Sequence, residues 1–240
     1  MTILLPATRT PPTRLAAGPP VLLIHGFASS ADADWPAERW AAPLAAAGRE
    51  AVEVHLPGHP GGPAAAEVTT TKLIDALAAT AGPSEVDVVG YSLGARLAWD
   101  LAAHPKMSVR RLVLGGLSPQ EPFAAVDLAA ARAAVRGGPV PADPLTAAIA
   151  GMAAAGDATS LLNLVEGLAA EPFDPAEAVP AVPTLFLAGQ EDPMAQGIEQ
   201  LVARVPHARL QHVTGDHQGA LAGDELQAAV FEFLDLNGRS

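Results

Sequence analysis

Cysteine is absent from this 240-residue chain. Its absence excludes disulfide bonds, thiolate metal sites and a cysteine nucleophile, and it leaves the redox compartment unconstrained. Aromatic residues are scarce at 4%, and basic residues are outnumbered, since 14 Lys and Arg stand against 26 Asp and Glu for a formal net charge of -12. A surface of this charge repels nucleic acid and anionic membranes, so neither is an expected partner.

Long hydrophobic runs and the common cofactor motifs are missing as well. No uninterrupted apolar run reaches the roughly 20 residues that a membrane helix needs. Residues 1–9 lack the basic start and long apolar stretch of a signal peptide. No H-E-x-x-H, G-x-G-x-x-G or P-loop pattern occurs. We therefore expect a cytoplasmic protein with no cofactor, no metal and no membrane span, whose oligomeric state the sequence leaves open.

Short apolar segments alternate with longer segments of helical periodicity. Half of the residues are hydrophobic, and the length suits one large α/β domain. Apolar runs bounded by glycine and proline predict strands buried on both faces, and the segments between them predict helices. The predicted strands are 21–25, 51–55, 86–90, 111–115, 184–188 and 209–213, and the predicted helices are 37–47, 71–81, 93–103 and 224–234. This alternation predicts a mostly parallel, doubly wound sheet.

One long segment interrupts the alternation. Residues 118–179 contain no convincing strand, and three parts of them have the pattern of helices: 126–135, 144–155 and 159–170. We therefore predict a small helical cap, residues 118–179, inserted before the strand at 184–188. The predicted core domain consists of residues 1–117 and 180–240.

The strongest chemical signal is the G-x-S-x-G pattern Gly90-Tyr91-Ser92-Leu93-Gly94. It lies between a predicted strand and a predicted helix, the context of a nucleophile elbow, which places the serine at the carboxyl end of the sheet. The backbone N–H of Leu93 would then lie at a helix N-terminus, where an oxyanion finds a donor. A tight turn with a capping serine is the alternative interpretation of the five residues alone.

A second oxyanion donor is expected in the loop after an early strand. His25-Gly26-Phe27 ends the first predicted strand, and the backbone N–H of Phe27 is the candidate donor. Taken alone, the tripeptide also fits a strand-to-helix turn with an interior histidine. Its agreement with the elbow favours the oxyanion interpretation.

A serine nucleophile needs a base, and the base needs an orienting carboxylate. Among the seven histidines, His217 lies just beyond the last predicted strand, on the same side of the sheet as Ser92. Asp192 follows the strand at 184–188, although it also fits a helix N-cap before a proline. Glu191 and Asp216 are nearby alternatives. The order serine, aspartate, histidine is the one expected of this kind of sheet.

Together these motifs resemble the α/β-hydrolase superfamily in its single-chain capped form. The resemblance spans about residue 19 to the C-terminus. It rests on an H-G-F element, an L-P-G-H loop, the elbow, a G-x-x-D acid loop and a G-x-H base loop, at residues 25–27, 56–59, 90–94, 189–192 and 215–217. It implies an α/β-hydrolase fold and a carboxylesterase-like activity. Serine at position 92 argues against the dehalogenase and epoxide-hydrolase branches, which use aspartate there. His55 departs from the family, which often has aspartate before L-P-G-H, and the roles of His55 and His59 stay open.

The expected reaction is hydrolysis of a small ester, thioester or lactone through an acyl-enzyme on Ser92. Tyr91 in the elbow and Phe123, Met152 and Met194 in or beside the cap are the candidate substrate-binding residues. A carbon–carbon bond hydrolase or an acyltransferase would use the same three catalytic residues. A non-catalytic small-molecule-binding protein on this scaffold could also retain them. The sequence does not choose among these activities.

Overall fold

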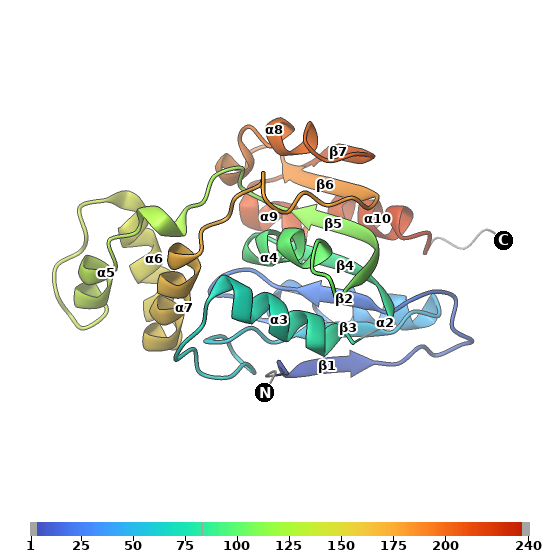
Figure 1. The fold of residues 1–240 in the computed structure, drawn as a ribbon, viewed down its shortest axis with the longest axis horizontal. Coiled ribbons are helices and arrows are strands. Elements are labelled where there is room, and N and C mark those ends of the chain that lie inside the picture. Colours follow the sequence, from blue (N-terminus) through green and yellow to red (C-terminus); the bar gives the residue numbers. More distant parts are fainter. Residues whose placement is uncertain (1–3, 83, 237–240) are drawn as a thin grey trace.

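A seven-stranded sheet forms the centre of the computed structural model, which describes residues 4–82 and 84–236 (Figure 1). The strands lie in the order β1-β3-β2-β4-β5-β6-β7. They are β1 (Ala7–Thr10), β2 (Val21–Ile24), β3 (Ala51–Val54), β4 (Glu85–Tyr91), β5 (Ser108–Gly115), β6 (Thr184–Gly189) and β7 (Ala208–Val213). All neighbouring pairs are parallel except β1 and β3. The predicted mostly parallel sheet is confirmed, and β1 is an additional edge strand.

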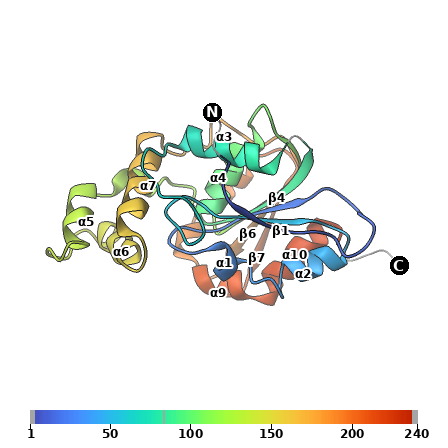
Figure 2. The same ribbon diagram turned by 90° about the horizontal axis from the view of Figure 1, so that it is seen from below.

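Helices cover both faces of the sheet (Figure 2). Helices α3 and α4 pack on one face, and α1, α2, α9 and α10 pack on the other, so that each face has its own layer of buried apolar side chains. The helices of these layers and the short α8 are α1 (Ala31–Asp34), α2 (Ala41–Ala46), α3 (Thr70–Ala81), α4 (Leu93–Ala102), α8 (Glu199–Val202), α9 (His217–Ala222) and α10 (Asp224–Phe233). Among the described residues, no helix is long and apolar enough to cross a membrane.

The helix predicted over residues 37–47 is wrong in its extent. Only Ala41–Ala46 is helical there, and a separate short helix, α1, precedes it. Pro36 ends α1, because the residue before a proline avoids helical backbone, and Trp35 has φ of -121° and ψ of 58°. Trp35 and Trp40 are both buried, with ring centroids 4.9 Å apart. Burial of these two indoles overrides the helix propensity of Ala37, Glu38 and Arg39 between them.

The segment between β5 and β6, called the insertion below, consists of helices without a strand. It projects from the end of the sheet at which β5 finishes (Figure 1). Its elements are η1 (Phe123–Ala125), α5 (Leu128–Ala134), α6 (Pro144–Ala154) and α7 (Ala158–Ala170), close to the predicted helical segments. The division of the chain into a core and a cap at residues 118 and 179 stays a prediction.

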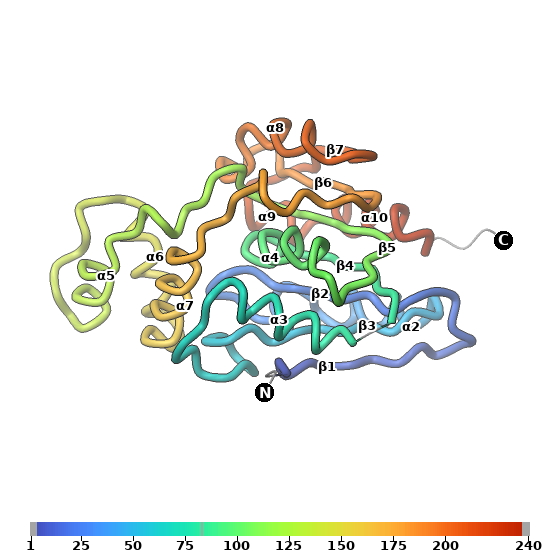
Figure 3. The backbone as a smooth tube through the Cα atoms, in the orientation of Figure 1, coloured from blue at the N-terminus to red at the C-terminus, as the bar shows by residue number. Residues whose placement is uncertain are grey.

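The two connections between the insertion and the sheet run side by side in the backbone trace (Figure 3), and Glu121 joins them. Its Oε1 accepts the backbone N–H of Phe123 at 2.7 Å, and its Oε2 accepts that of Phe173 at 2.9 Å. The Nη2 atom of Arg96 on α4 lies 3.1 Å from Glu121 Oε2, and the two side chains are only 5% and 9% exposed. This buried ion pair attaches the base of the insertion to the helix that follows Ser92.

Candidate active site

Ser92 stands on a sharp turn between β4 and α4. Its φ of 55° and ψ of -116° lie in a region that residues with side chains rarely adopt. The turn is so tight that a Cβ atom on Gly90 would lie 2.2 Å from the carbonyl oxygen of Gly94, and one on Gly94 would lie 1.9 Å from that of Ile24. Both positions therefore require glycine. The strand, turn and helix expected around the G-x-S-x-G pattern are all present.

A hydrogen bond joins the Asp192 carboxylate to the His217 imidazole. The distance from His217 Nδ1 to Asp192 Oδ2 is 2.7 Å, and Asp192 Oδ1 accepts the backbone N–H of Met194 at 2.8 Å. Asp192 thus also caps the short helix η2 (Pro193–Ala195), as its place before a proline suggested. The Asp192 side chain is 0% exposed and that of His217 is 22% exposed. With Nδ1–H directed at the carboxylate, the Nε2 lone pair of His217 is left to accept a proton.

The two alternative carboxylates do not contact the imidazole. Glu191 and Asp216 are exposed, and Asp216 accepts the backbone N–H of Gly219 as the N-cap of α9. His217 is the first residue of that helix. On its other side, the Tyr91 hydroxyl donates to the His217 carbonyl oxygen at 2.6 Å, and the two rings are 5.3 Å apart between centroids. The imidazole is therefore held both through its ring and through its backbone.

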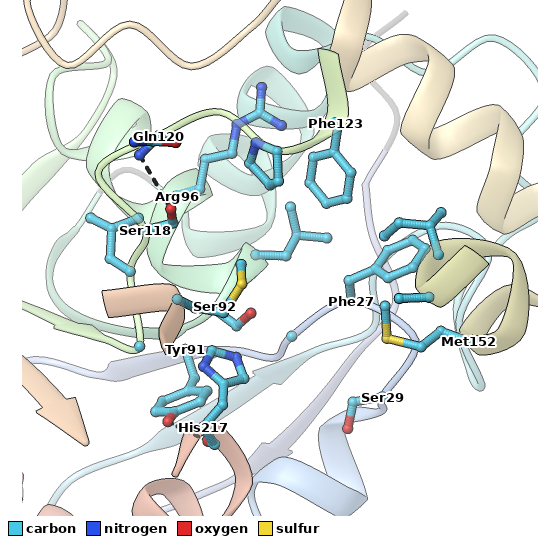
Figure 4. A pocket seen from close by; sticks show the side chains of 18 of the residues that line it. Phe27, Ser29, Tyr91, Ser92, Arg96, Ser118, Gln120, Phe123, Met152 and His217 are labelled. Atoms are coloured by element: carbon cyan, nitrogen blue, oxygen red, sulfur yellow. Dashed lines mark hydrogen bonds between the residues drawn. The ribbon is translucent and has the colours of Figure 1, made fainter. Parts of the chain in front are cut away.

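Ser92 and His217 line one cavity of about 290 Å³ (Figure 4). Most of the lining side chains are apolar, and they come from the loop after β2, the elbow, η1 and α6. All four residues predicted to bind substrate belong to the lining: Tyr91, Phe123, Met152 and Met194. The two methionines are also exposed on the surface, so they lie toward the open side of the cavity. Contact of these residues with a substrate stays a prediction.

Two backbone N–H groups near Ser92 have no acceptor. Throughout the described part of the chain, neither the N–H of Phe27 nor that of Leu93 donates a hydrogen bond. The loop that carries Phe27 approaches the elbow closely, since a Cβ atom on Gly26 would lie 3.4 Å from the Cβ of Ser92. Free amides in such a place can stabilise a negatively charged oxygen. They are the two amides that the sequence predicts as oxyanion donors.

His25 and His59 form a buried pair behind this loop. Their ring centroids are 4.8 Å apart with an interplanar angle of 70°. His25 Nε2 accepts the backbone N–H of Leu56 at 3.2 Å, and His59 Nε2 accepts that of Ala28 at 2.9 Å. Each Nδ1 donates to a backbone carbonyl. Burial lowers the pKa of both imidazoles to about 4, so both are neutral near pH 7.

The stability contributed by neutral His59 is expected to decline as the solution is acidified. Its pKa is 6.5 when unfolded and about 4 when folded, so this contribution is complete above pH 6.5 and is lost between pH 6.5 and pH 4. In urea titrations, acidification from pH 7 to pH 4.5 should lower the stability of the wild type relative to His59→Gln by about 2–3 kcal/mol. Asp34 and His25, which interact with His59, are present in both proteins.

His212→Gln is the control for this titration, because His212 is exposed on β7. Between pH 7 and pH 4.5, the stability of the wild type relative to His212→Gln should show no comparable drop. A difference between wild type and His59→Gln that does not vary with pH would contradict a buried, neutral His59.

Comparisons with known proteins agree with this fold. The sequence profile of the Alpha/beta hydrolase family matches residues 21–229, and the chain therefore belongs to the α/β-hydrolase family. Among solved structures, it is similar to MenH from S. aureus, with a TM-score of 0.76 and 18% identity over 97% of this chain and 99% of the other. No curated protein sequence matches the chain.

Two further solved structures share the fold. The enol-lactonase from Burkholderia xenovorans has a TM-score of 0.71 and 20% identity, over 96% of each chain. The thermophilic esterase from Thermogutta terrifontis has a TM-score of 0.69 and 20% identity, over 96% of this chain and 93% of the other. At such identities the likeness shows the fold, and the chemistry has to be argued from the site itself.

Three charged residues in the cavity lining carry no sequence motif: Asp34, Arg96 and Glu121. Of the three, only Arg96 could have been noticed in the sequence. It lies in a largely apolar helix, and a charge on the buried face of a helix needs a partner. His55, whose role the sequence leaves open, contacts the edge strand β1. Its Nε2 is 3.0 Å from the hydroxyl of Thr8 on the edge strand.

Proposed function

We propose that the protein is a serine hydrolase that cleaves a small ester, thioester or lactone through an acyl-enzyme. One observation carries the proposal: a serine on a strained turn shares a cavity with an imidazole that is hydrogen-bonded to a buried carboxylate. In this proposal Ser92 is the nucleophile, His217 is the general base and Asp192 orients the imidazole. No cofactor is needed.

In the first half of the reaction, the Ser92 hydroxyl attacks the substrate carbonyl and its proton moves to His217 Nε2. The buried Asp192 carboxylate stabilises the imidazolium through Nδ1. The N–H groups of Phe27 and Leu93 hold the oxyanion, and each good donor lowers the barrier by about 3–4 kcal/mol. The imidazolium then protonates the leaving oxygen or sulfur as the bond from the carbonyl carbon breaks, which leaves the acyl group on Ser92.

In the second half, a water molecule attacks the acyl-enzyme. His217 accepts the water proton, the same two amides hold the second oxyanion, and the proton is returned to the Ser92 oxygen as the acid leaves. The cavity of about 290 Å³ is at the small end of ligand pockets, and its apolar walls favour a compact acyl group. The enol-lactonase and the esterase among the solved structures have names that agree with this class of bond.

Labelling with a fluorophosphonate probe tests the nucleophile. The wild type should be labelled, Ser92→Ala should not be labelled at all, and His217→Ala should be labelled far more slowly because the hydroxyl has lost its base. Ser108→Ala is the control, since this serine is exposed at the start of β5, at the opposite end of the sheet. An unlabelled wild type or a labelled Ser92→Ala protein would contradict the proposal.

A substrate panel then separates the activities that the same three residues could support. We expect turnover of p-nitrophenyl esters, thioesters and lactones with short acyl groups, and a decline with longer ones. Turnover of vinylogous diketones in place of esters would indicate cleavage of a carbon–carbon bond, and faster product formation with an added alcohol would indicate acyl transfer. Tight binding of a small molecule without any turnover would indicate a binding protein.

A further inference from the structure

Buried side chains hold the loop after β2 on both sides of Phe27. The N–H of Gly26 donates to Asp34 Oδ2 at 2.7 Å, and the N–H of Ala28 donates to His59 Nε2 at 2.9 Å. The Ser29 hydroxyl donates to the other oxygen of Asp34. Among the described residues, the Phe27 N–H between these two amides has no acceptor. The free Phe27 N–H therefore has a hydrogen-bonded N–H on either side of it.

The conformation of this loop is not one that its sequence favours. Ala28 has φ of 56°, in the left-handed region that alanine avoids. A backbone in such a region persists only where its surroundings hold it. The hydrogen bonds to Asp34 and His59 supply that support, so the direction of the intervening Phe27 N–H depends on two side chains outside the loop.

Both supporting side chains are themselves rigidly placed. Asp34 is the buried last residue of α1, and His59 is buried in the loop after β3, where its Nδ1 donates to Pro57 O at 2.9 Å. Asp34 also borders the reacting centre, since a Cβ atom on Gly26 would lie 3.4 Å from both Asp34 Oδ2 and the Cβ of Ser92. Figure 4 shows Phe27 and Ser29 on the wall of the cavity that contains Ser92.

We propose that Asp34 and His59 are positioning residues for oxyanion stabilisation. They bind the amides that flank Phe27 and thereby direct the free Phe27 N–H toward the oxygen that becomes negative during attack by Ser92. Neither residue needs to touch the substrate, because each acts through the loop. This inference rests on the proposed function and adds two residues to its machinery.

Two substitutions of Asp34 separate the effect of its charge from the effect of its hydrogen bond to Gly26. Asn in place of Asp34 keeps an acceptor for the Gly26 N–H, whereas Leu at that position keeps none. With p-nitrophenyl butyrate, Asp34→Leu should lower kcat about 10²–10³-fold, the loss typical of one oxyanion donor, with little change in KM. Asp34→Asn should recover most of the lost kcat.

A second measurement reports on the oxyanion itself. A trifluoromethyl ketone with the same acyl length forms a tetrahedral, negatively charged adduct with an activated serine, so its affinity should fall with kcat across the Asp34 variants. Asp32→Leu is the matched control, because Asp32 is exposed on the same short helix, and it should leave kcat, KM and ketone affinity unchanged. Should Asp34→Leu fail to fold, His59→Gln and His59→Leu supply the same comparison, since only glutamine offers an acceptor to Ala28.

If the fluorophosphonate probe labels Ser92 in the wild type, two outcomes would overturn the inference. One is full kcat and full ketone affinity in folded Asp34→Leu and His59→Leu. The other is an Asp34→Asn protein as impaired as Asp34→Leu, which would assign the effect to charge. Absence of Ser92 labelling in the wild type would instead contradict the proposed function, so the two failures are distinguishable.

Discussion

Asp192→Asn is expected to lower kcat by about 10⁴-fold with little change in substrate affinity. Asp192 Oδ1 accepts the backbone N–H of Met194, and Oδ2 faces His217 Nδ1. In the variant, the amide oxygen should keep the bond to Met194, which turns the amide NH₂ toward the imidazole. His217 Nδ1 must then accept a hydrogen bond, so the ring proton moves to Nε2. An imidazole protonated on Nε2 cannot accept the Ser92 proton.

Steady-state kinetics with a p-nitrophenyl ester check this expectation, together with the rate of fluorophosphonate labelling. Asp216→Asn is the matched control: Asp216 lies next to His217 but caps α9, and asparagine is an equally good N-cap. It should retain nearly full kcat. The assignment would be refuted if Asp216→Asn lost activity while Asp192→Asn turned over normally. Asp216 would then be the residue that orients His217.

Gly94→Ala is expected to destabilise the protein by at least about 3 kcal/mol. The added methyl group would lie 1.9 Å from the carbonyl oxygen of Ile24 and 2.8 Å from that of His25. Both atoms belong to the backbone and cannot rotate away, so α4 would have to move off β2. Alanine has the higher helix propensity by up to about 1 kcal/mol, which is too little to offset the clash.

Urea unfolding monitored by circular dichroism measures this effect. Gly151→Ala is the control, because Gly151 lies in α6 and a Cβ atom there would meet nothing within 4 Å. The same substitution should be neutral there or stabilise the protein by up to about 1 kcal/mol. Equal stability of Gly94→Ala and the wild type would mean that the elbow is less tightly packed against β2 than these distances indicate.

The sheet was largely predictable because its central strands are buried on both faces. β2 and β6 have no exposed residue, so each appears in the sequence as a continuous apolar run. β1 could not be found in this way. It is an antiparallel edge strand whose four residues are all at least partly exposed, and its sequence, ATRT, has no apolar run.

The three proposed catalytic residues were predictable for a different reason. Ser92, Asp192 and His217 each follow a parallel strand, and the carboxyl ends of parallel strands meet at one edge of the sheet. The predicted strands alone were therefore enough to predict that these three side chains lie near one another. Asp34 and Glu121 are held by partners in other loops and helices, and such pairings depend on tertiary packing that no local pattern encodes.

The position of Glu121 has a consequence for how such a protein can diversify. Because one carboxylate binds the backbone N–H groups of Phe123 and Phe173, the two ends of the insertion are held next to each other. Lengthening, shortening or replacing α5 and α6 changes nothing that the crossover from β5 to β6 has to span, whereas α7 is bound to the core, since its Leu168 carbonyl accepts from Arg96. Insertions or recombination in α6 can therefore change the distal wall of the cavity, which includes Met152, without changing the residues around Ser92. In the proposed enzyme, the residues that select the substrate and the residues that react with it can therefore evolve separately.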